Sequence, residues 1–290
     1  MSASSPAPPR FAVLVPVKQT AVAKSRLAGL GDDTRRGLAA SFAADTVAAA
    51  LACPLVGLVL VVTDDHRLAA ALRGQGAEVV PDGTSDLNGT LLQAAAEAHR
   101  RHQDLGLAAL CADLPALRPD DLALALRAAD PARMSFVADA QRVGTTMVVA
   151  PTLESFRPSF GAGSRGRHLE AGAGEIAIEV PTLRRDVDDP TALADALRLG
   201  VGPHTSAVAA THRLFAASGR AAMQGTVSAF DEGTRAGRVL LDDGVELRFE
   251  AAALEGSALR LLRPGQRVRL ETVVEEGTRR ILAVQILTLH

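Results

Sequence analysis

Tryptophan and tyrosine are absent from this chain of 290 residues, and aromatic residues make up only 3% of it. The absence removes most of the side chains on which nucleic-acid-binding domains stack bases. Cysteine occurs twice, at Cys53 and Cys111, each in or beside an apolar run. Two such residues form no recognisable disulfide or zinc framework, so we expect buried free thiols.

Long apolar runs and an excess of one charge are also missing. No stretch approaches the roughly 20 apolar residues of a membrane span. Residues 1–10 are rich in Ser, Pro and Ala and lack the apolar segment of a signal peptide. A net charge of −2 gives no bulk attraction to nucleic acid or to an anionic membrane. We therefore expect a cytoplasmic protein with a flexible N-terminus at residues 1–10 and no membrane partner.

Lysine is nearly missing, because Lys18 and Lys24 are the only lysines among 31 basic residues. All other basic residues are arginine. Two clustered lysines therefore indicate a function that needs a compact positive charge on a flexible side chain, such as contact with a phosphate oxygen. They follow an apolar run at residues 11–15 and precede a helical pattern that begins near Asp32. In α/β proteins, a strand, a cationic loop and a helix hold nucleotide phosphates. Two surface lysines spaced by chance are the alternative.

Strand-like runs and helical patterns alternate through the first two hundred residues. Several runs are nearly continuous Val, Leu and Ala, which is typical of strands covered on both faces of a largely parallel sheet. This order predicts an open, mostly parallel α/β sheet with ligands at the carboxyl ends of its strands. Strands are expected at residues 11–17, 55–63, 78–80, 107–112, 135–138, 146–150 and 177–180, and helices at 32–51, 66–74, 90–101, 119–129 and 191–199.

Acidic residues follow two of these runs. Asp113 comes directly after the run at 107–112 and before a turn, a place suited to a divalent cation or, alternatively, to a cap of that turn. Asp186 and Asp188 follow another expected strand, and in extended backbone their side chains share a face. Asp189, followed by proline, indicates a helix cap. Asp113 with either Asp186 or Asp188 makes a sensible two-carboxylate Mg²⁺ site.

Two loops are rich in small residues. Residues 160–170 contain three glycines, whose backbone amides can approach an anion, and Ser164, Arg165 and Arg167 add donors. Gly144-Thr145-Thr146 precedes another strand and supplies a further amide and hydroxyl. We expect both loops on the same edge of the sheet as the lysines and the acidic strand ends.

Taken in order, these motifs resemble the guanylyltransferase family of coenzyme F420 biosynthesis, which joins GTP to 2-phospho-L-lactate, phosphoenolpyruvate or a related phospho-acid. After Thr145 the sequence has Thr146 where many members of that family have Asn or a second Gly, so the identity of the acid stays open. The matching segments are Pro16-Val17-Lys18, Ala23-Lys24-Ser25-Arg26-Leu27, Leu87-Asn88, Ala112-Asp113-Leu114-Pro115, Gly144-Thr145, Phe160-Gly161 with Ser164 and Arg167-His168, and Asp186-Val187-Asp188 before Pro190.

The resemblance implies a Rossmann-like nucleotidyltransferase domain over residues 11–204. It also implies that the two lysines and two of the aspartates are catalytic. The implied site residues are Asp113 and Asp188 for Mg²⁺; Lys18, Lys24, Arg26 and Asn88 for GTP; and Thr145, Gly161 and Ser164 for the phospho-acid.

The implied reaction needs no activated Ser, Cys or His. The phosphate oxygen of the acid attacks the α-phosphorus of GTP and pyrophosphate leaves, so catalysis depends on positioning and charge neutralisation. Phosphoenolpyruvate is the first expectation for the acceptor, and 2-phospho-L-lactate is the second. The alternatives among enzymes are nucleotidyltransferases of 3-phosphoglycerate or of molybdopterin type, but the longer Gly-rich loop of the latter is missing here.

The pattern changes after residues 205–222, which we expect to form a linker or a short helix. Beyond it, short strands separated by turn signals predict a small all-β, OB-like barrel at residues 223–290. The segments at 225–230, 242–244 and 264–268 resemble a cold-shock domain. The strands are expected at 224–230, 237–241, 246–249, 267–274 and 280–287.

Cold-shock domains bind single-stranded nucleic acid by stacking bases on aromatic rings. Here only Phe230 and Phe249 remain for stacking, and ten acidic residues outnumber nine arginines over residues 223–290, so we expect no nucleic-acid partner. A structural role, homodimerisation or a lid over the active site are the open alternatives for this domain. Outside the enzymes, the alternative is a nucleotide-sensing, nucleic-acid-binding regulator. The lysines, with Asp113 and Asp188, favour the enzyme.

Overall fold

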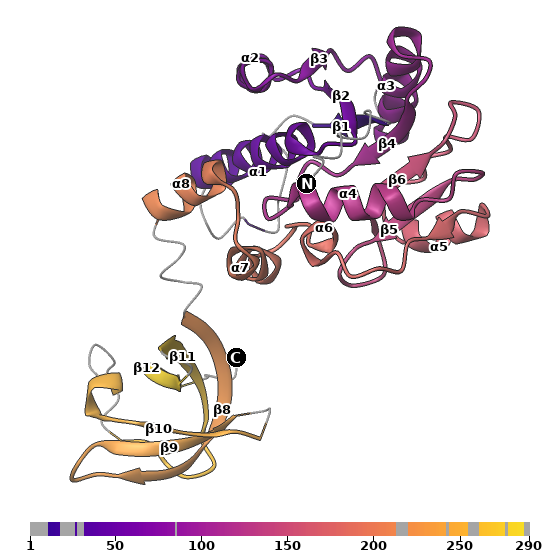
Figure 1. Cartoon of the computed structure of the whole chain (residues 1–290). Coiled ribbons are helices and arrows are strands. Elements are labelled where there is room, and N and C mark those ends of the chain that lie inside the picture. Colours follow the sequence, from indigo (N-terminus) through magenta and orange to yellow (C-terminus); the bar gives the residue numbers. More distant parts are fainter. Residues whose placement is uncertain are drawn as a thin grey trace, which may run out of the picture. The chain divides into compact units, whose positions relative to one another are not determined.

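The computed structural model describes residues 11–17, 27, 32–84, 86–212, 220–241, 244–254, 261–275 and 278–286. The chain divides into two compact units, residues 1–212 and residues 213–290. The first is a sheet with helices packed on it, and the second is built mainly from strands (Figure 1). Within the described ranges, none of the helices combines the length and apolar character needed to cross a bilayer.

The sheet of the first unit is mixed but mostly parallel, as the sequence predicted. Only β6 is antiparallel to its neighbours in the described sheet. The chain moves outward from β1 to β3 and then returns to the other side of β1 with β4, so the strand order reverses between β1 and β4. Open α/β sheets bind ligands at such a point. The order is β3 (Glu78–Val80), β2 (Val56–Val62), β1 (Phe11–Pro16), β4 (Gly106–Leu110), β6 (Thr145–Ala150), β5 (Ser135–Ala138) and β7 (Gly174–Glu175).

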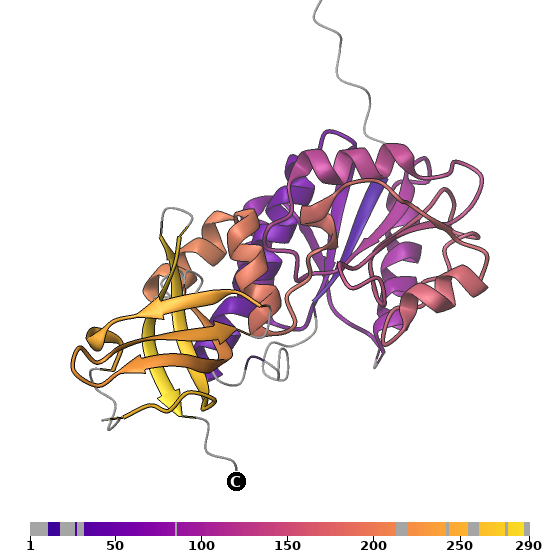
Figure 2. The same ribbon diagram turned by 90° about the horizontal axis from the view of Figure 1, so that it is seen from below.

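Helices cover both faces of this sheet (Figure 2). On one face α1 (Asp32–Ala52), α2 (His66–Gln75), α4 (Pro119–Ala128) and α6 (Pro181–Arg184) share one apolar core with Val13 and Val15 of β1. On the other face α3 (Leu87–Arg101) packs on Ala12 and Leu14. Because alternate residues of β1 enter two different apolar cores, the strand reads as one continuous apolar run. Both cysteines are free thiols; Cys53 is buried and Cys111 is half-buried.

A strand expected at residues 177–180 is not formed. The seventh strand is instead the short β7 at 174–175, and the chain then turns into α6. The Arg184 guanidinium donates to the carbonyl oxygens of Ile176 and Ile178, at 2.8 and 3.2 Å. These carbonyls are therefore satisfied by a side chain and need no neighbouring strand. As a consequence, Asp186 and Asp188 follow a short helix and not a strand.

The segment expected to be a linker, residues 205–222, contains regular structure at both ends. α7 (Pro190–Leu199) is followed by α8 (Pro203–Thr211), which belongs to the first unit, and β8 begins at Arg220. The buried Asp45 in α1 accepts the backbone N–H groups of His204 and Thr205, at 3.0 and 2.8 Å. It therefore satisfies two of the unpaired donors at the start of α8.

The second unit is a five-stranded, all-antiparallel sheet, which confirms the prediction of a separate all-β unit. The two outer strands, β10 and β12, contact each other, which is consistent with a small barrel of the OB type. Phe249 packs directly over Gly237, where an added Cβ would lie 2.5 Å from the ring. The order is β10 (Glu246–Phe249), β9 (Ala236–Leu241), β8 (Arg220–Asp231), β11 (Arg267–Glu275) and β12 (Thr278–Ile286), with a short 3₁₀ helix at Ala251–Leu254.

Candidate active site

Several strand ends meet at one edge of the first unit's sheet. The carboxyl end of β4 leads to Asp113, and that of β5 leads to Asp139. Because β6 runs in the opposite direction, its first residue, Thr145, lies at the same edge. Cys111 joins the two strands there by donating its N–H to the carbonyl of Thr146, at 2.9 Å. An antiparallel strand thus brings a hydroxyl to the edge where parallel strands deliver carboxylates.

A pocket of about 640 Å³ opens at this edge. It gathers both acidic segments and both small-residue loops, which are far apart in the sequence. Five of the site residues implied by the family resemblance line it: Asp113, Thr145, Gly161, Ser164 and Asp188. The other lining residues are Leu87, Cys111, Asp139, Val143, Gly144, Phe160, Ala162, Gly163 and Asp186.

Asp113, Asp186 and Asp188 form the acidic side of the pocket. Asp186 and Asp188 both line it, whereas Val187 between them is fully buried. The N–H of Val187 donates to the carbonyl of Asp113, at 3.0 Å, which fastens this segment to the end of β4. The side chains therefore alternate as the sequence predicted, although a helix and not a strand precedes them.

The concentration of carboxylates shifts the ionisation of Asp186. Burial, and then the negative charges of Asp113, Asp188 and Asp139, raises the pKa of Asp186 to about 7. A bound cation relieves repulsion of this kind. Among the described residues, no group of three or more His, Cys, Asp or Glu side chains converges as a ready-made metal centre. The donor set fits an ion held by one or two carboxylates, with water and substrate phosphates completing the coordination.

Asp139 is a residue of the pocket that the sequence analysis did not single out. Its carboxylate accepts the backbone N–H groups of Val143 and Gly144, at 2.8 and 2.7 Å, and closes the turn that leads into Thr145. A Cβ on Gly144 would lie 2.5 Å from the Asp139 carboxylate, so a side chain there would displace it. The sequence signal was an Asp five residues before a glycine, which is too common in turns to be noticed.

The glycine loop, residues 159–163, is held by side chains from α3 and α5 (Ser164–Glu170). Asn88 in α3 donates from Nδ2 to the carbonyl of Phe160, at 3.2 Å, and its Oδ1 accepts the Phe160 N–H, at 2.8 Å. Arg167 donates to the side chain and the carbonyl of Ser159, both at 3.0 Å. Asn88, which the resemblance assigned to the nucleotide, uses its side-chain amide on the loop in this structure.

The two arginines expected to donate to an anion point elsewhere. Arg165 pairs with Glu175 of β7, at 2.8 Å, and Arg167 donates to the glycine loop. Their guanidinium groups therefore bind other parts of the chain, and neither arginine is among the residues that line the pocket. Ser164, in contrast, lines the pocket.

Lys18, Lys24 and Arg26 lie outside the described residues, so their contacts stay predictions. The last described residue before them is Val17, whose N–H donates to the carbonyl of Val62 at the end of β2, at 2.8 Å. The chain therefore leaves the described part at the carboxyl end of β1, beside β4.

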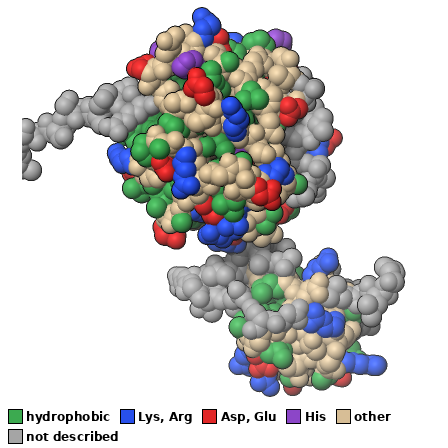
Figure 3. Space-filling view, turned by 90° about the vertical axis from the view of Figure 1, so that its right-hand side faces the viewer, with side chains coloured by type: hydrophobic (Ala, Val, Ile, Leu, Met, Phe, Trp, Pro, Cys, Tyr) green, Lys and Arg blue, Asp and Glu red, His purple; other side chains and the backbone are tan. Residues whose placement is uncertain are grey.

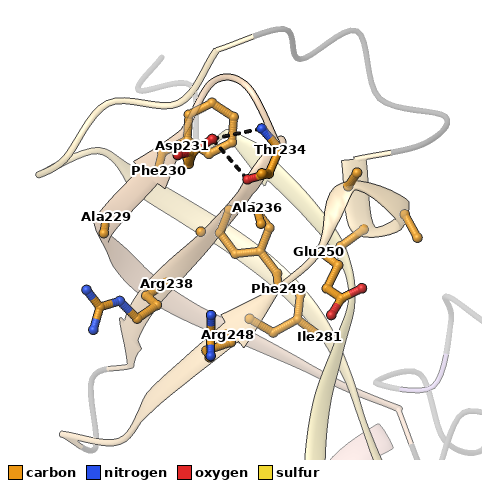
Figure 4. A pocket seen from close by; sticks show the side chains of 14 residues that line it. Ala229, Phe230, Asp231, Thr234, Ala236, Arg238, Arg248, Phe249, Glu250 and Ile281 are labelled. Carbon is orange, nitrogen blue, oxygen red and sulfur yellow. Dashed lines mark hydrogen bonds between the residues drawn. The ribbon is translucent and has the colours of Figure 1, made fainter.

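The second unit has a pocket of its own, of about 990 Å³, over β8, β9 and β10 (Figure 4). The rings of Phe230 and Phe249 stack there with 6.2 Å between their centroids. Arg238 and Arg248 lie opposite each other on neighbouring strands. Two carboxylates, Asp231 and Glu250, also line this pocket, and Asp231 accepts hydrogen bonds from the backbone N–H and the hydroxyl of Thr234. On the face shown in Figure 3, basic and acidic side chains are interspersed without a large basic area.

Comparison with known proteins decides the family. Residues 11–205 match the model of a family described as "Guanylyl transferase CofC like". The phosphoenolpyruvate guanylyltransferase of Thermomonospora curvata is 50% identical over 202 residues, which cover 69% of this chain and 89% of the relative. The chain belongs to the CofC-like guanylyl transferase family. It is therefore an enzyme of the nucleotidyltransferase class.

Further members support this assignment. The phosphoenolpyruvate guanylyltransferase of Streptomyces coelicolor is 48% identical over 69% of this chain and 96% of the relative, and that of Streptosporangium roseum is 46% identical over 68% and 90%. Among solved structures, a putative nucleotide-diphospho-sugar transferase from Desulfovibrio desulfuricans G20 has a TM-score of 0.53 at 15% identity, over 71% of this chain and 96% of that one. That likeness concerns the fold alone. The five-stranded unit lies beyond the CofC-like match.

Proposed function

We propose that this protein transfers the guanylyl group of GTP to phosphoenolpyruvate and releases pyrophosphate, as a step of coenzyme F420 biosynthesis. Relatives named for phosphoenolpyruvate guanylyl transfer share 46% to 50% identity with the first unit. The observation in this chain that carries the proposal is the pocket at the sheet edge, where an acidic cluster and a glycine loop with two hydroxyl side chains line one cavity.

The acceptor would bind against the glycine loop. A phospho-acid carries a phosphate and a carboxylate, and both need hydrogen-bond donors. Thr145 and Ser164 offer hydroxyl groups on this side of the pocket, and Gly161 offers backbone. Gly161 has a φ of 117°, a conformation that residues with side chains rarely adopt, so glycine allows the backbone to approach an anion closely.

The nucleotide phosphates would bind on the acidic side, through Mg²⁺ held by Asp113 and Asp188. When bound, Mg²⁺ supplies charge neutralisation at the phosphates of GTP and at the leaving pyrophosphate. Lys18, Lys24 and Arg26 follow β1 in the sequence, and we assign them to the same phosphates as cations. Asn88 would hold the glycine loop, because both of its amide atoms engage the Phe160 backbone.

In the reaction, a phosphate oxygen of the acceptor forms a bond to the α-phosphorus of GTP. The bond from that phosphorus to the oxygen bridging the β-phosphate breaks, and pyrophosphate departs with the electron pair. A phosphate dianion is a competent nucleophile, so no general base is required. The chain contributes alignment of two anions and compensation of their charge, which are the main sources of catalysis in phosphoryl-type transfers.

The test is pyrophosphate release by the purified full chain with GTP and Mg²⁺, with phosphoenolpyruvate, 2-phospho-L-lactate and 3-phosphoglycerate supplied in parallel. Release that requires both GTP and phosphoenolpyruvate supports the proposal. Release with only one of the other acids keeps guanylyl transfer and changes the acceptor. Folded protein that binds GTP but releases no pyrophosphate with any acid would overturn the proposal and favour a nucleotide sensor.

A further inference from the structure

His168 is a fully buried histidine with a partner on each ring nitrogen. Its Nε2 accepts the backbone N–H of Ser159, at 3.0 Å, and its Nδ1 lies 3.0 Å from Oγ1 of Thr145. Because a backbone N–H can only donate, the nitrogen that faces it carries no proton. In the neutral ring the single proton is therefore on Nδ1, which faces Thr145 Oγ1 and also has the backbone of Ser164 as a hydrogen-bond partner.

This tautomer has a consequence for the hydroxyl group of Thr145. The Thr145 oxygen accepts a hydrogen bond from His168, so its own proton points away from the ring. Thr145 lines the pocket at the sheet edge with 6% of its surface exposed. The hydroxyl is thereby prepared as a donor to an anion in the pocket and not as an acceptor.

We propose that His168 is a positioning residue that orients the Thr145 hydroxyl as a hydrogen-bond donor to the anionic phospho-acid. Through its hydrogen bond with Ser159 the imidazole also fixes the start of the glycine loop. One side chain therefore positions both the Thr145 hydroxyl and the glycine loop. The identity of the ligand rests on the proposed function. The orientation of the hydroxyl rests only on the contacts of His168.

The surroundings of the ring keep it neutral. Phe136 of β5 and Phe160 of the glycine loop lie against it, with 5.4 and 5.7 Å between ring centroids, and Arg167 is its charged neighbour on α5. Burial, and then the positive charge of Arg167, lowers the pKa of His168 to about 4. A second proton on Nε2 would face the N–H of Ser159 and break that contact. His168 therefore serves near neutral pH as a fixed donor and not as a proton carrier.

Matched substitutions separate the contacts. His168→Phe keeps an aromatic ring between Phe136 and Phe160 but loses both hydrogen bonds. His168→Asn keeps a donor near the position of Nδ1. Thr145→Val removes the hydroxyl while keeping the side-chain shape, and Thr145→Ser retains the hydroxyl.

We expect His168→Phe and Thr145→Val each to raise the KM for phosphoenolpyruvate roughly 10- to 100-fold, the usual effect of losing a hydrogen bond to a charged group. The KM for GTP should change less than about twofold. His168→Asn and Thr145→Ser should recover most of the loss. Because His168 acts through the hydroxyl, the double variant should lose much less than the product of the two single effects.

Three outcomes would overturn the inference: equal changes in KM for both substrates, strictly multiplicative effects in the double variant, or no effect of His168→Phe in a folded protein. The ¹⁵N shifts of the imidazole in the wild-type protein provide a test that needs neither activity nor a variant. Between pH 6 and pH 8 we expect a proton on Nδ1 only; a proton on Nε2, or on both nitrogens, contradicts the inference. If wild-type protein shows no transfer, the proposed function fails, and the imidazole shifts still decide the orientation of Thr145.

Discussion

Individual carboxylates of the pocket have different tasks. Asp139 accepts two backbone N–H groups and shapes the turn before Thr145. Asp186 is buried enough, and close enough to other negative charges, that its pKa rises to about 7. Asp113 lies three residues after the end of β4, a central strand, and Asp188 is its more exposed partner from the segment after α6. This division favours Asp113 and Asp188 as the groups that hold a cation.

Asp113→Asn tests that division. The amide keeps the size of the side chain but removes the charge that a divalent cation needs, so we expect kcat to fall at least about 100-fold while the protein stays folded. Pyrophosphate release at saturating Mg²⁺ measures the effect. Asp104→Asn is the matched control, because Asp104 is exposed and precedes the opposite end of β4. Turnover of Asp113→Asn at the wild-type rate would contradict the metal assignment.

The pKa of His168 makes stability depend on pH. Its pKa is about 4 in the folded protein against 6.5 for a free histidine, so the unfolded chain takes up the proton first. The stability contribution is present above pH 6.5 and is lost as the pH falls from 6.5 toward 4. Between pH 7 and pH 5 this group alone lowers the free energy of unfolding by roughly 2 kcal/mol.

Urea unfolding at the two pH values, followed by helical circular dichroism, checks this prediction. His168→Asn should lose about that part of the pH dependence, because asparagine does not titrate. An unchanged pH dependence in the variant would show that another group causes it.

Whether the sequence alone predicts these residues depends on how far apart along the chain the interacting residues are. Asp113, Thr145 and Ser164 could be predicted because each stands at a strand end or in a glycine-rich segment, which is local information. The pairing of His168 with Thr145 joins residues 23 positions apart, and it needs the antiparallel β6 to bring them together. No local pattern predicts such a contact.

At the scale of elements, α8 is attached to the first unit by a buried carboxylate. Asp45 has 4% of its surface exposed and satisfies two backbone donors at the start of α8. Gly202 lies directly against it, where an added Cβ would approach the carboxylate carbon to 2.4 Å. The start of α8 therefore depends on a residue from the middle of α1.

Asp45→Ala should lower the free energy of unfolding by roughly 2 to 4 kcal/mol, because it leaves two backbone N–H groups without their acceptor. Thermal or urea unfolding of the first unit measures the loss. Asp33→Ala is the control in the same helix, since Asp33 is exposed and pairs only with the surface residue Arg36 in the described structure. That control should cost less than about 1 kcal/mol. Equal losses for the two variants would refute the capping role.

Most helices and strands of the first unit could be predicted from the pattern of their apolar residues. The strands contribute side chains to both apolar cores, so they stand out in the sequence as continuous apolar runs. The apolar run at 177–180 misled the prediction, since its neighbouring carbonyl groups are satisfied by Arg184 and not by a strand. α8 was expected as linker or short helix because its composition of small residues carries little periodicity. A side-chain contact decides each case: that of Arg184 with carbonyl groups a few residues earlier in the chain, and that of Asp45 in α1 with the start of α8.

At the scale of the whole molecule, the family match and the second unit are separate. The CofC-like match ends at residue 205, and the relatives are covered over 89% to 96% of their own length by this part of the chain. These relatives, which are named for guanylyl transfer, therefore have little sequence outside the aligned region.

A chain truncated after residue 212 should therefore fold and keep its kcat within about threefold of the full chain. The comparison is pyrophosphate release by equal amounts of the two proteins, with circular dichroism as the check on folding. A folded but inactive truncated chain would mean that the second unit takes part in catalysis, as a lid or through association.

The most direct test of the central claim follows the label from [α-³²P]GTP. With phosphoenolpyruvate and Mg²⁺, we predict that the label enters a new species whose mass contains both the guanylyl and the enolpyruvyl phosphate groups, and that Asp113→Asn nearly abolishes it. If the label remains in GTP, or appears only in guanosine mono- or diphosphate with or without phosphoenolpyruvate, guanylyl transfer to this acceptor is contradicted.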